Sequence, residues 1–432
     1  MKICLIGAGY VGLVSGSCFA DLGNTVICVD KDKDKINLLN SNKIPIFEPG
    51  LEELIIKNKS SGRLSFTTEI DLAVKKSDIV FICVGTPTSK TDGSANLKYV
   101  YEVAKELRKY INKFKIIVNK STVPVTTGDR VEKIISEKKN RKLFEVVSNP
   151  EFLREGEAIR DFRFPDRIVV GTENNKVINK LKSLYEPLVK KGAKFLSTNR
   201  RGAEIIKYAS NAFLATKISF INEIANLCEK TNVNVEDISI GIGLDQRIGS
   251  RFLRAGPPYG GSCFPKDTKA ITVTANKFKT DLSIIKSVIN SNNKRKLLLT
   301  KKIKLILSNK IKNKKITFLG VTFKPNTDDM RESSSLHMIP YLLRKGAKIS
   351  YYDPSGPKNE LLKHNNLFYR KNIKDACLGS DLVIIHTEWE EFKALDFSKL
   401  YKKKKFKIYD MRNLYSPDHM KRKGFIYFSI GR

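Results

Sequence analysis

The sequence predicts an α/β protein in which two Rossmann-like, doubly wound domains are joined by a central helical domain with a long helix. Short apolar runs alternate with helical patterns over the first 200 residues. A helical pattern without Pro or Gly then extends from Ala203 to Glu229, and the strand–helix alternation returns at Lys315. Because 432 residues suffice for two or three domains of ~150 residues, we expect domains at 1–200, 201–300 and 301–432.

The N-terminal residues predict a strand, a glycine turn, a helix and a second strand. The apolar run Lys2–Ile6 leads into Gly7-Ala-Gly-Tyr-Val-Gly12, a helical stretch to about Leu22, and the apolar run Thr25–Val29, which ends in Asp30. Further apolar runs predict later strands of the same parallel sheet, at Asp78–Val84, Lys115–Val118, Glu145–Val147 and Arg167–Val170.

A glycine triplet between a strand and a helix predicts a dinucleotide-binding site. Gly7 permits the tight turn, Gly9 lets the backbone approach a pyrophosphate, and Gly12 lets the helix pack closely on the sheet. The helix N-terminus supplies N–H groups for the phosphates. Asp30 is expected to bind the ribose hydroxyls and to repel a 2′-phosphate, so the predicted cofactor is NAD rather than NADP.

The C-terminal part repeats this α/β unit. Strands are predicted at Lys315–Gly320 and Lys348–Tyr352, with a helix at Leu336–Arg344 between them. The run that begins Ser380-Asp-Leu-Val is similar to the run that begins Ser77-Asp-Ile-Val. Val-Thr-Phe-Lys-Pro, rather than a glycine triplet, follows the first of these strands. We therefore expect the fold here without a dinucleotide site.

A cysteine loop, Tyr259-Gly-Gly-Ser-Cys263-Phe-Pro-Lys-Asp267, is the most informative stretch outside the glycine turn. Its glycines permit close approach of the backbone to a ligand, and Lys266 favours the reactive thiolate of Cys263. A thiolate beside NAD adds to an aldehyde, the hemithioacetal loses a hydride, and water cleaves the thioester. The loop thus predicts oxidation to the level of a carboxylic acid. The other cysteines lie in apolar patterns and are expected to be buried and inert.

Such chemistry needs an oxyanion stabiliser and a base. Lys207 and Asn211 lie at positions i and i+4 of the long helical pattern, so both are expected on one face. Glu151 and Glu155 have the same spacing, and Pro150 is expected to open a helical turn there. On spacing alone, each pair is more typical of a solvated helix face.

Charge and cysteine usage limit the classes of partner. The formal net charge is +34, but the basic excess is spread along the chain, including Lys402–Lys405 in an expected solvated loop. Without a basic–aromatic RNA motif or a DNA-reading helix, we expect no nucleic-acid partner. The seven cysteines and four histidines are scattered without metal-ligand spacing, which predicts no metal and reduced thiols in the cytoplasm. Ile3–Ala20 is uncharged but broken by glycines, so we expect neither a membrane span nor a signal peptide.

These motifs and several others, in order along nearly the whole chain, resemble the UDP-glucose 6-dehydrogenase family of nucleotide-sugar dehydrogenases. They are GAGYVG at 7–12, FEPGL at 47–51, VGTPT at 84–88, STVPV at 121–125, NPEFLREG at 149–156, GGSCFPKD at 260–267 and FKPNTDDMRES at 323–333. The resemblance implies an NAD-dependent oxidation of C6 of UDP-glucose to the carboxylate of UDP-glucuronate, a precursor of polysaccharides. It also implies a homodimer.

The resemblance implies catalytic roles as well. Cys263 is the implied nucleophile, which forms the thiohemiacetal and then the thioester. Lys207 and Asn211 would hold the oxyanion and the sugar oxygen at C6, and Asp267 and Thr122 would order the water and the proton relay.

Glu155 is an implied base in thioester hydrolysis and also belongs to both implied binding sites. The implied cofactor residues are Gly7, Gly9, Val11, Gly12, Asp30, Lys35, Thr86, Thr122, Glu155, Lys266 and Arg331. The implied substrate residues are Glu151, Phe152, Leu153, Arg154, Glu155, Lys207, Asn211, Arg247, Phe252, Leu253, Arg254, Ala255, Gly256, Gly260 and Lys324. Arg247 is implied to reach the diphosphate from a neighbouring subunit, so that dimerisation would complete the site.

Two alternatives remain open. Pro257 and Pro258 stiffen the loop before Gly260, where the family often has an extra glycine or aromatic residue, so the sugar could instead be that of GDP-mannose or a UDP-N-acetylhexosamine. The chain could also be a non-catalytic nucleotide-sugar sensor or a basic nucleic-acid-binding protein. The presence of Cys263, Lys207 and Asp267 argues against loss of catalysis.

Overall fold

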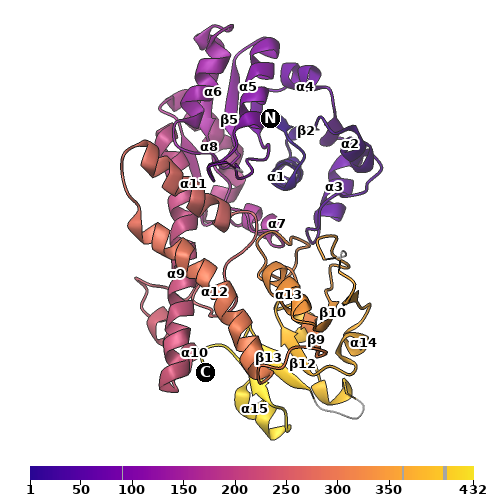
Figure 1. The fold of residues 1–432 in the computed structure, drawn as a ribbon. Helices are drawn as coiled ribbons and strands as arrows, with labels where there is room; N and C mark the ends of the chain where they lie inside the picture. The colour runs from indigo at the N-terminus through magenta and orange to yellow at the C-terminus, as the bar shows by residue number, and fades with distance from the viewer. Residues whose placement is uncertain (90, 362–363, 402–405) are drawn as a thin grey trace. The chain divides into compact units, whose positions relative to one another are not determined.

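The structure is a computed structural model that describes residues 1–89, 91–361, 364–401 and 406–432, so Lys402–Lys405 lie outside the described residues. Residue contacts divide the chain into two units. The first unit comprises Met1–Ser210 and Lys269–Thr280, and the second comprises Asn211–Thr268 and Asp281–Arg432. Each unit contains one sheet with covering helices (Figure 1).

The first unit is built on an eight-stranded sheet in the order β3-β2-β1-β4-β5-β6-β7-β8. Its strands are β1 (Lys2–Ile6), β2 (Thr25–Val29), β3 (Leu64–Thr67), β4 (Ile79–Ile82), β5 (Lys115–Asn119), β6 (Phe144–Ser148), β7 (Arg167–Gly171) and β8 (Lys194–Thr198). β7 pairs antiparallel with β6 through Ser148 and Gly171, and β8 is parallel to β7. The prediction of a fully parallel sheet is therefore wrong at this edge, because an apolar run indicates a buried strand but not its direction.

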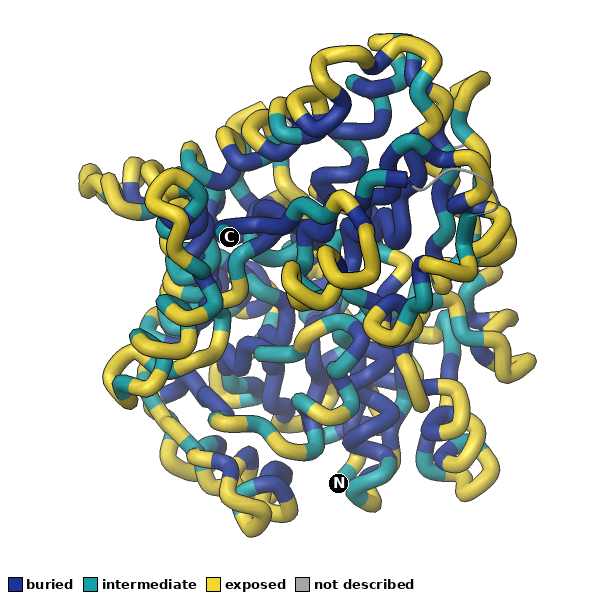
Figure 2. Tube along the Cα trace, turned by 90° about the horizontal axis from the view of Figure 1, so that it is seen from below, coloured by how far each residue is buried: buried dark blue, intermediate teal, exposed yellow. Residues whose placement is uncertain are grey.

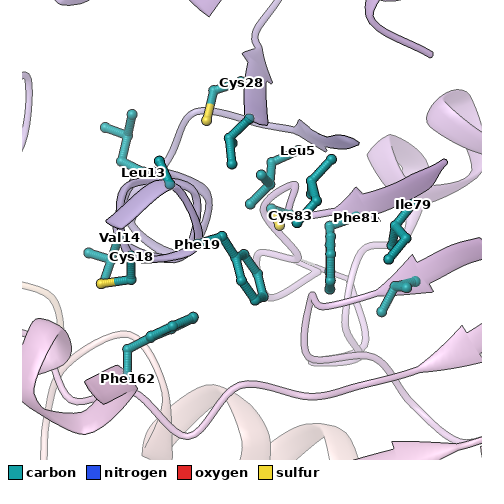
Figure 3. Packing of buried hydrophobic residues seen from close by; sticks show 14 of the residues in the cluster. Leu5, Leu13, Val14, Cys18, Phe19, Cys28, Ile79, Phe81, Cys83 and Phe162 are labelled. Atoms are coloured by element: carbon teal, nitrogen blue, oxygen red, sulfur yellow. The ribbon is translucent and has the colours of Figure 1, made fainter. Parts of the chain in front are cut away.

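Helices cover this sheet and fix the glycine turn against it. They are α1 (Tyr10–Asp21), α2 (Lys33–Asn40), α3 (Leu51–Ser60), α4 (Ile70–Lys76), α5 (Lys98–Tyr110), α6 (Thr127–Ser136), α7 (Ala158–Arg163) and α8 (Asn175–Val189), with a 3-10 turn, η1 (Arg141–Leu143). Figure 3 shows Phe19 of α1 directed toward Phe81 of β4 and Phe162 of α7. The ring centroids lie 5.1 and 5.0 Å apart, the second pair edge to face. These contacts help to bury α1, in which every residue from Gly12 to Ala20 is buried.

The second unit has a six-stranded parallel sheet in the order β11-β10-β9-β12-β13-β14. Its strands are β9 (Lys315–Leu319), β10 (Lys348–Tyr352), β11 (Leu367–Tyr369), β12 (Leu382–Ile385), β13 (Lys407–Asp410) and β14 (Tyr427–Phe428). The remaining helices are α9 (Arg200–Thr231), α10 (Val235–Gly243), α11 (Phe264–Lys277), α12 (Ser283–Ile306), α13 (Ser335–Arg344), α14 (Ile373–Cys377) and α15 (Pro417–Arg422), with 3-10 turns η2 (Glu390–Phe392) and η3 (Phe397–Lys399). Residues of α9 and α11 belong to both units.

The predicted fold class is confirmed, since two α/β sheets are accompanied by a helical region with a 32-residue helix, α9. β3 and β8 of the first sheet were not predicted, and neither were β11, β13 and β14 of the second. β8 is largely exposed, and β11 and β14 have only three and two residues, so none of these three forms a clear apolar run. The boundaries of the three predicted domains stay a prediction. Figure 2 colours each residue by its burial and shows buried stretches alternating with exposed ones along the chain. Over the described ranges, no helix is long and apolar enough to cross a membrane.

Candidate active site

The glycine turn between β1 and α1 has the geometry that a dinucleotide requires. Gly7 has φ = +105°, and a Cβ there would lie 2.8 Å from the carbonyl oxygen of Cys83. A Cβ on Gly12 would lie 1.8 Å from the carbonyl oxygen of Gly7, whereas one on Gly9 would meet no heavy atom of the described chain within 4 Å. The first turn of α1 carries no acidic side chain. A pyrophosphate at Gly9 therefore has space, backbone N–H groups and the positive end of a helix.

Asp30 follows β2 and hydrogen-bonds to this turn. Its Oδ2 accepts the Ala8 N–H and the Lys35 ammonium, each at 2.9 Å, and its Oδ1 accepts the Asp32 N–H at 3.1 Å. Burial raises the pKa of the Asp30 carboxyl, but the bonds from Asp32, Lys35 and Ala8 outweigh it and hold the pKa below its usual value. A charged carboxylate oxygen accepts about two hydrogen bonds, so Oδ1 can also accept a ribose hydroxyl. Val11, also predicted to bind the cofactor, is half-buried in the first turn of α1.

Two other predicted cofactor residues are in contact at the same edge of the sheet. Thr86 Oγ1 donates a hydrogen bond to the Thr122 carbonyl oxygen at 2.9 Å, and Ser121 Oγ donates to the Val84 carbonyl oxygen at 2.7 Å. These residues follow β4 and β5, which are adjacent and parallel, so their loops leave the sheet at its carboxyl end, as the glycine turn does. In such folds the carboxyl end is where ligands bind.

The segment from Asn149 to Gly156 is not helical, so the prediction that Pro150 opens a helical turn is wrong. Glu151 and Glu155 consequently do not share a helix face. The chain folds instead into a loop between β6 and α7, in which Glu151 is buried and Glu155 is half-buried. A four-residue spacing also occurs in loops, and it predicts a shared face only where a helix forms.

Glu48, in the FEPGL motif, holds the end of this loop. Its buried carboxylate accepts the Gly156 N–H at 2.6 Å and the Ala158 N–H at 2.7 Å. Tyr10, from the glycine turn, hydrogen-bonds to the same carboxylate and accepts the Gly156 N–H at 2.8 Å. Three motifs distant in sequence are thereby joined. The roles of Tyr10 and Glu48 were not predictable from the sequence, because no local pattern marks a partner more than a hundred positions away.

A buried ion pair connects the loop to α9. Lys207 Nζ lies 3.1 Å from Glu151 Oε1, and the side chains are 4% and 6% exposed. Glu151 also accepts the Leu153 N–H at 2.6 Å, and Lys207 lies 5.2 Å from the centroid of the Phe152 ring. Arg154 is exposed and is bound to Asp161 at 2.7 Å. The predicted oxyanion-binding ammonium is thus buried and held by one carboxylate.

Cys263 differs from every other cysteine in the chain, because it is half-exposed and the other six are buried, as predicted. Burial raises the pKa of the Cys18, Cys83 and Cys377 thiols to about 12, so these thiols are inert at neutral pH. The Cys263 carbonyl oxygen accepts the Asp267 N–H at 2.8 Å, which places this cysteine at the N-terminus of α11. The helix dipole there favours a thiolate.

The buried carboxylate of Asp267 contacts two of the predicted site residues, and Asp267 is 1% exposed. Asn211 Nδ2 donates to Asp267 Oδ2 at 2.6 Å, and the Lys266 ammonium forms an ion pair with Asp267 Oδ1. Asn211 is buried on α9, one turn beyond Lys207. The cluster supplies a carboxylate and an amide with fixed orientations, which is what ordering a water molecule requires.

The glycines before Cys263 are required by a neighbouring segment. A Cβ on Gly260 would lie 2.7 Å from the Glu332 carbonyl oxygen, and one on Gly261 would lie 2.6 Å from the Phe323 ring. The Gly261 N–H donates to the Arg331 carbonyl oxygen at 2.8 Å. The cysteine loop therefore packs directly on the FKPNTDDMRES segment. Two predicted site residues lie on this segment, Lys324, half-buried over the Phe323 ring, and Arg331, bound to Asp329.

The predicted substrate loop at 252–256 is held by polar side chains of α9 and α12. Asn222 Oδ1 accepts the Gly256 N–H at 2.8 Å, and Arg295 Nε donates to the Gly256 carbonyl oxygen at 3.1 Å. Phe252 has φ = +67°, a strained value for a bulky residue. Of the other loop residues, Leu253 is buried, Ala255 is half-buried and Arg254 is exposed.

Arg412 is a further residue that the sequence analysis missed. Its guanidinium lies 3.7 Å from the position of a Cβ on Gly256, and it donates to the carbonyl oxygens of Phe323 at 2.9 Å and His386 at 2.8 Å. Its place just after β13, at the carboxyl end of a parallel strand, was the available signal. The second sheet thus offers a half-buried cation, paired with Glu388 at 2.8 Å, beside the predicted substrate loop.

The carboxyl end of the second sheet differs from that of the first. Asp353, after β10, corresponds to Asp30, but it is fully buried and accepts the Val321 N–H at 2.8 Å and the Ser355 N–H at 3.0 Å. No helix begins after β9 before Ser335 in the described chain. These features support the prediction of a Rossmann-like fold without a dinucleotide site. The described residues also contain no group of three or more His, Cys, Asp or Glu suited to a metal ion.

Arg247 is not brought together with the other predicted residues. It follows α10, its side chain is 88% exposed, and it is bound to Asp245 at 2.6 Å.

Comparisons with known proteins indicate one family along the whole chain. Models of the UDP-glucose/GDP-mannose dehydrogenase family match at residues 1–189 (NAD binding domain), 201–294 (central domain) and 317–417 (UDP binding domain). The chain is 49% identical to UDP-glucose 6-dehydrogenase of Rhizobium meliloti, over 100% of both chains. It is 45% identical to UDP-glucose 6-dehydrogenase TuaD of Bacillus subtilis, over 100% of this chain and 93% of the relative.

A solved structure of a UDP-glucose dehydrogenase from the archaeon Pyrobaculum islandicum superposes with a TM-score of 0.90 at 35% identity, covering 99% of this chain and 96% of the other. The family models, the relatives and the solved structure thus indicate the same enzyme family as the glycine turn and the cysteine loop do. The chain is a member of the UDP-glucose/GDP-mannose dehydrogenase family and an NAD-dependent oxidoreductase.

Proposed function

We propose that this protein oxidises C6 of UDP-glucose to the carboxylate of UDP-glucuronate, with two NAD consumed for each sugar. The observation that carries the proposal is the half-exposed Cys263 at the N-terminus of α11, in a chain whose other cysteines are all buried. A dehydrogenase that stops at an aldehyde needs no thiol. One that continues to the acid needs a nucleophile that retains the aldehyde.

The residues act as follows. Gly7, Gly9, Gly12 and Asp30 would hold NAD, which would supply the hydride acceptor for both oxidations. In the first oxidation the C6 hydroxyl gives its proton to the water ordered by Asp267, and carbon C6 gives up a hydride. Lys207 stabilises the developing oxyanion. The Cys263 thiolate then adds to the aldehyde carbon, and a proton on the former carbonyl oxygen completes the thiohemiacetal.

The second oxidation converts this adduct to a thioester by loss of the hydroxyl proton and a hydride. A water molecule ordered by Asp267 and Asn211 then attacks the thioester carbon, with Thr122 in the relay and Glu155 as base. The C–S bond breaks, the sugar leaves as its carboxylate, and Cys263 returns as a thiolate. Asp267 suits this role because its buried carboxylate is already hydrogen-bonded to Asn211 at 2.6 Å. The loops with Lys324, Arg254 and Arg412 supply cations for the diphosphate.

The deciding experiment measures NADH absorbance with limiting UDP-glucose, GDP-mannose and UDP-N-acetylglucosamine in parallel reactions. We expect two NADH for each UDP-glucose and little from the other two. One NADH for each sugar would contradict the role of Cys263, because the aldehyde would be escaping. Comparable yields from GDP-mannose or UDP-N-acetylglucosamine would assign the protein to that substrate. No NADH in any reaction, with NAD still bound, would favour a non-catalytic nucleotide-sugar sensor.

We further propose that the protein is a homodimer that works in the cytoplasm, where its seven free thiols remain reduced. Large apolar side chains lie exposed on α9 at seven-residue spacing, and others follow on α10 and at the residue directly after it. They are Phe213 (66% exposed), Phe220 (50%), Leu227 (59%), Ile240 (63%) and Leu244 (78%). Residues seven apart on a helix share a face, so a second copy could cover the α9 residues together. Arg247, three residues beyond Leu244, is exposed beside this surface and free of its own protomer's site.

Analytical ultracentrifugation tests the homodimer. We expect a dimer for the natural sequence and a monomer for Phe220→Asp, because a charge in an apolar interface is costly to bury. Ile426→Asp, at an apolar residue that is 57% exposed but lies outside α9 and α10, is the matched control and should remain dimeric. A monomeric natural protein would overturn the proposal.

A further inference from the structure

A third buried carboxylate in the first unit, that of Glu204, lies outside the reaction described above. Glu204 is on α9, three positions before Lys207, and is 2% exposed. Its Oε2 accepts the Thr126 N–H at 2.8 Å, and its Oε1 accepts the Gly128 N–H at 2.8 Å and the Ser148 hydroxyl at 3.0 Å. Burying a carboxylate is costly unless such donors satisfy it. The Glu204 carboxylate therefore links α9 to the segments that supply the three donors.

Each donor is attached to a segment that carries a predicted catalytic or substrate-binding residue. Thr126 and Gly128 begin α6 directly after the STVPV loop, which contains Thr122. Ser148 ends β6, directly before the loop that contains Glu151. Thr126 has φ = +76°, a rare conformation for a β-branched residue, and a Cβ on Gly128 would lie 3.0 Å from Glu204 Oε1. The backbone here is thus shaped around the carboxylate.

We propose that Glu204 is a positioning residue, whose carboxylate fixes Lys207 of α9 relative to the loops that carry Thr122 and Glu151. Displacement of a reacting group by about 1 Å can cost about 10²-fold in rate. The inference rests on the proposed function, because it assigns Glu204 to that reaction.

The ionisation of Glu204 gives the proposal a distinctive signature. Burial raises the pKa of its carboxyl to about 7; hydrogen bonds from Gly128, Ser148 and Thr126 lower it, and the charge of Asp129 raises it. The other charged or titratable groups that face it are Tyr101 on α5 and, on α9 itself, Arg201 and Arg200. The ionised carboxylate binds N–H donors more strongly than the neutral acid does, so we expect kcat to rise as pH increases through about 7.

The same raised pKa sets the sign of the effect on stability. Between the ordinary carboxyl pKa of 4.5 and about 7, the folded chain holds a proton that the unfolded chain has lost. Glu204 therefore contributes stability at low pH that disappears as pH rises through this window. An opposite response of rate and stability to pH separates a positioning role from a merely structural one.

The test compares the natural sequence with Glu204→Gln. The amide nitrogen of Gln cannot accept an N–H, so one of the three bonds is lost. We expect kcat with UDP-glucose to fall about tenfold, the rise of kcat near pH 7 to disappear, and the KM for NAD to change less than about twofold. Glu137→Gln is the matched control, because Glu137, directly after α6, forms an ion pair with Arg108 of α5 at 2.6 Å and has no assigned role in the reaction. Its kcat and pH profile should be unchanged.

Ser148→Ala is a second, milder variant that serves if Glu204→Gln does not fold. Loss of the Ser148 hydroxyl removes a bond that favours the charged form, so the rise in kcat should move to higher pH. A Glu204→Gln enzyme with unchanged kcat and the same rise near pH 7 would overturn the inference, as would an unmoved rise in Ser148→Ala. Failure of the natural sequence to oxidise any of the three sugar nucleotides would instead overturn the proposed function.

Discussion

Replacing Cys263 by Ser is expected to reduce steady-state NADH formation from UDP-glucose by ~10³-fold or more. A serine hydroxyl is ionised far less than a thiol at neutral pH, and the N-terminus of α11 cannot make up that difference. An ester formed on the substituted serine would also hydrolyse more slowly than a thioester. Each molecule of the variant should therefore form at most one or two NADH and then stall, because the oxidised sugar is not released.

Rapid quench followed by mass spectrometry of the intact protein checks this expectation. The natural sequence should show a transient covalent sugar adduct at Cys263, and Cys263→Ala should show none. Cys228→Ala is the control, because Cys228 is a buried cysteine on α9 and should be dispensable for turnover. Two NADH for each UDP-glucose at the natural rate from Cys263→Ser would show that the thiol is not the nucleophile.

Local geometry was predictable from the sequence wherever neighbouring residues decide it. Gly7 and Gly12 are required by contacts within their own turn and with the adjacent strand, and a strand–glycine–helix pattern carries that information. The position of Cys263 at a helix N-terminus was not predicted, although the adjacent glycines and Lys266 had indicated a reactive thiol. Residue type and short-range spacing thus sufficed for the glycine turn, but for Cys263 they indicated reactivity and not the helix.

Long-range partners and strand direction were not predictable. Glu48 and Glu204 are ordinary helix or loop carboxylates in the sequence, and only the fold brings them to backbone donors 76 to 110 positions away. The reversal at β7 leaves no trace in an apolar run, since parallel and antiparallel buried strands have similar compositions. The spacing of Glu151 and Glu155 suggested a helix that does not form, and Glu151 proved instead to be the partner of Lys207.

This ion pair leads to the second large expected effect. Lys207→Ala should leave the Glu151 carboxylate buried without its counter-charge, and breaking such a pair typically costs about 3–5 kcal/mol of unfolding free energy. The same change removes the cation assigned to the oxyanion, which should lower kcat by ~10²–10³-fold. Denaturant unfolding and NADH assays measure the two effects separately.

The double variant Lys207→Ala/Glu151→Gln separates stability from chemistry. Neutralising Glu151 removes the uncompensated charge, so most of the lost stability should return while turnover remains absent. Lys115→Met is the matched control, because Lys115 is a fully buried lysine of β5 that donates to the Ser77 carbonyl oxygen at 2.6 Å and has no assigned role in the reaction. That variant should be destabilised yet keep the natural kcat. If the double variant regained turnover along with stability, Lys207 would be needed only to neutralise Glu151, and the oxyanion would have to be stabilised by another group.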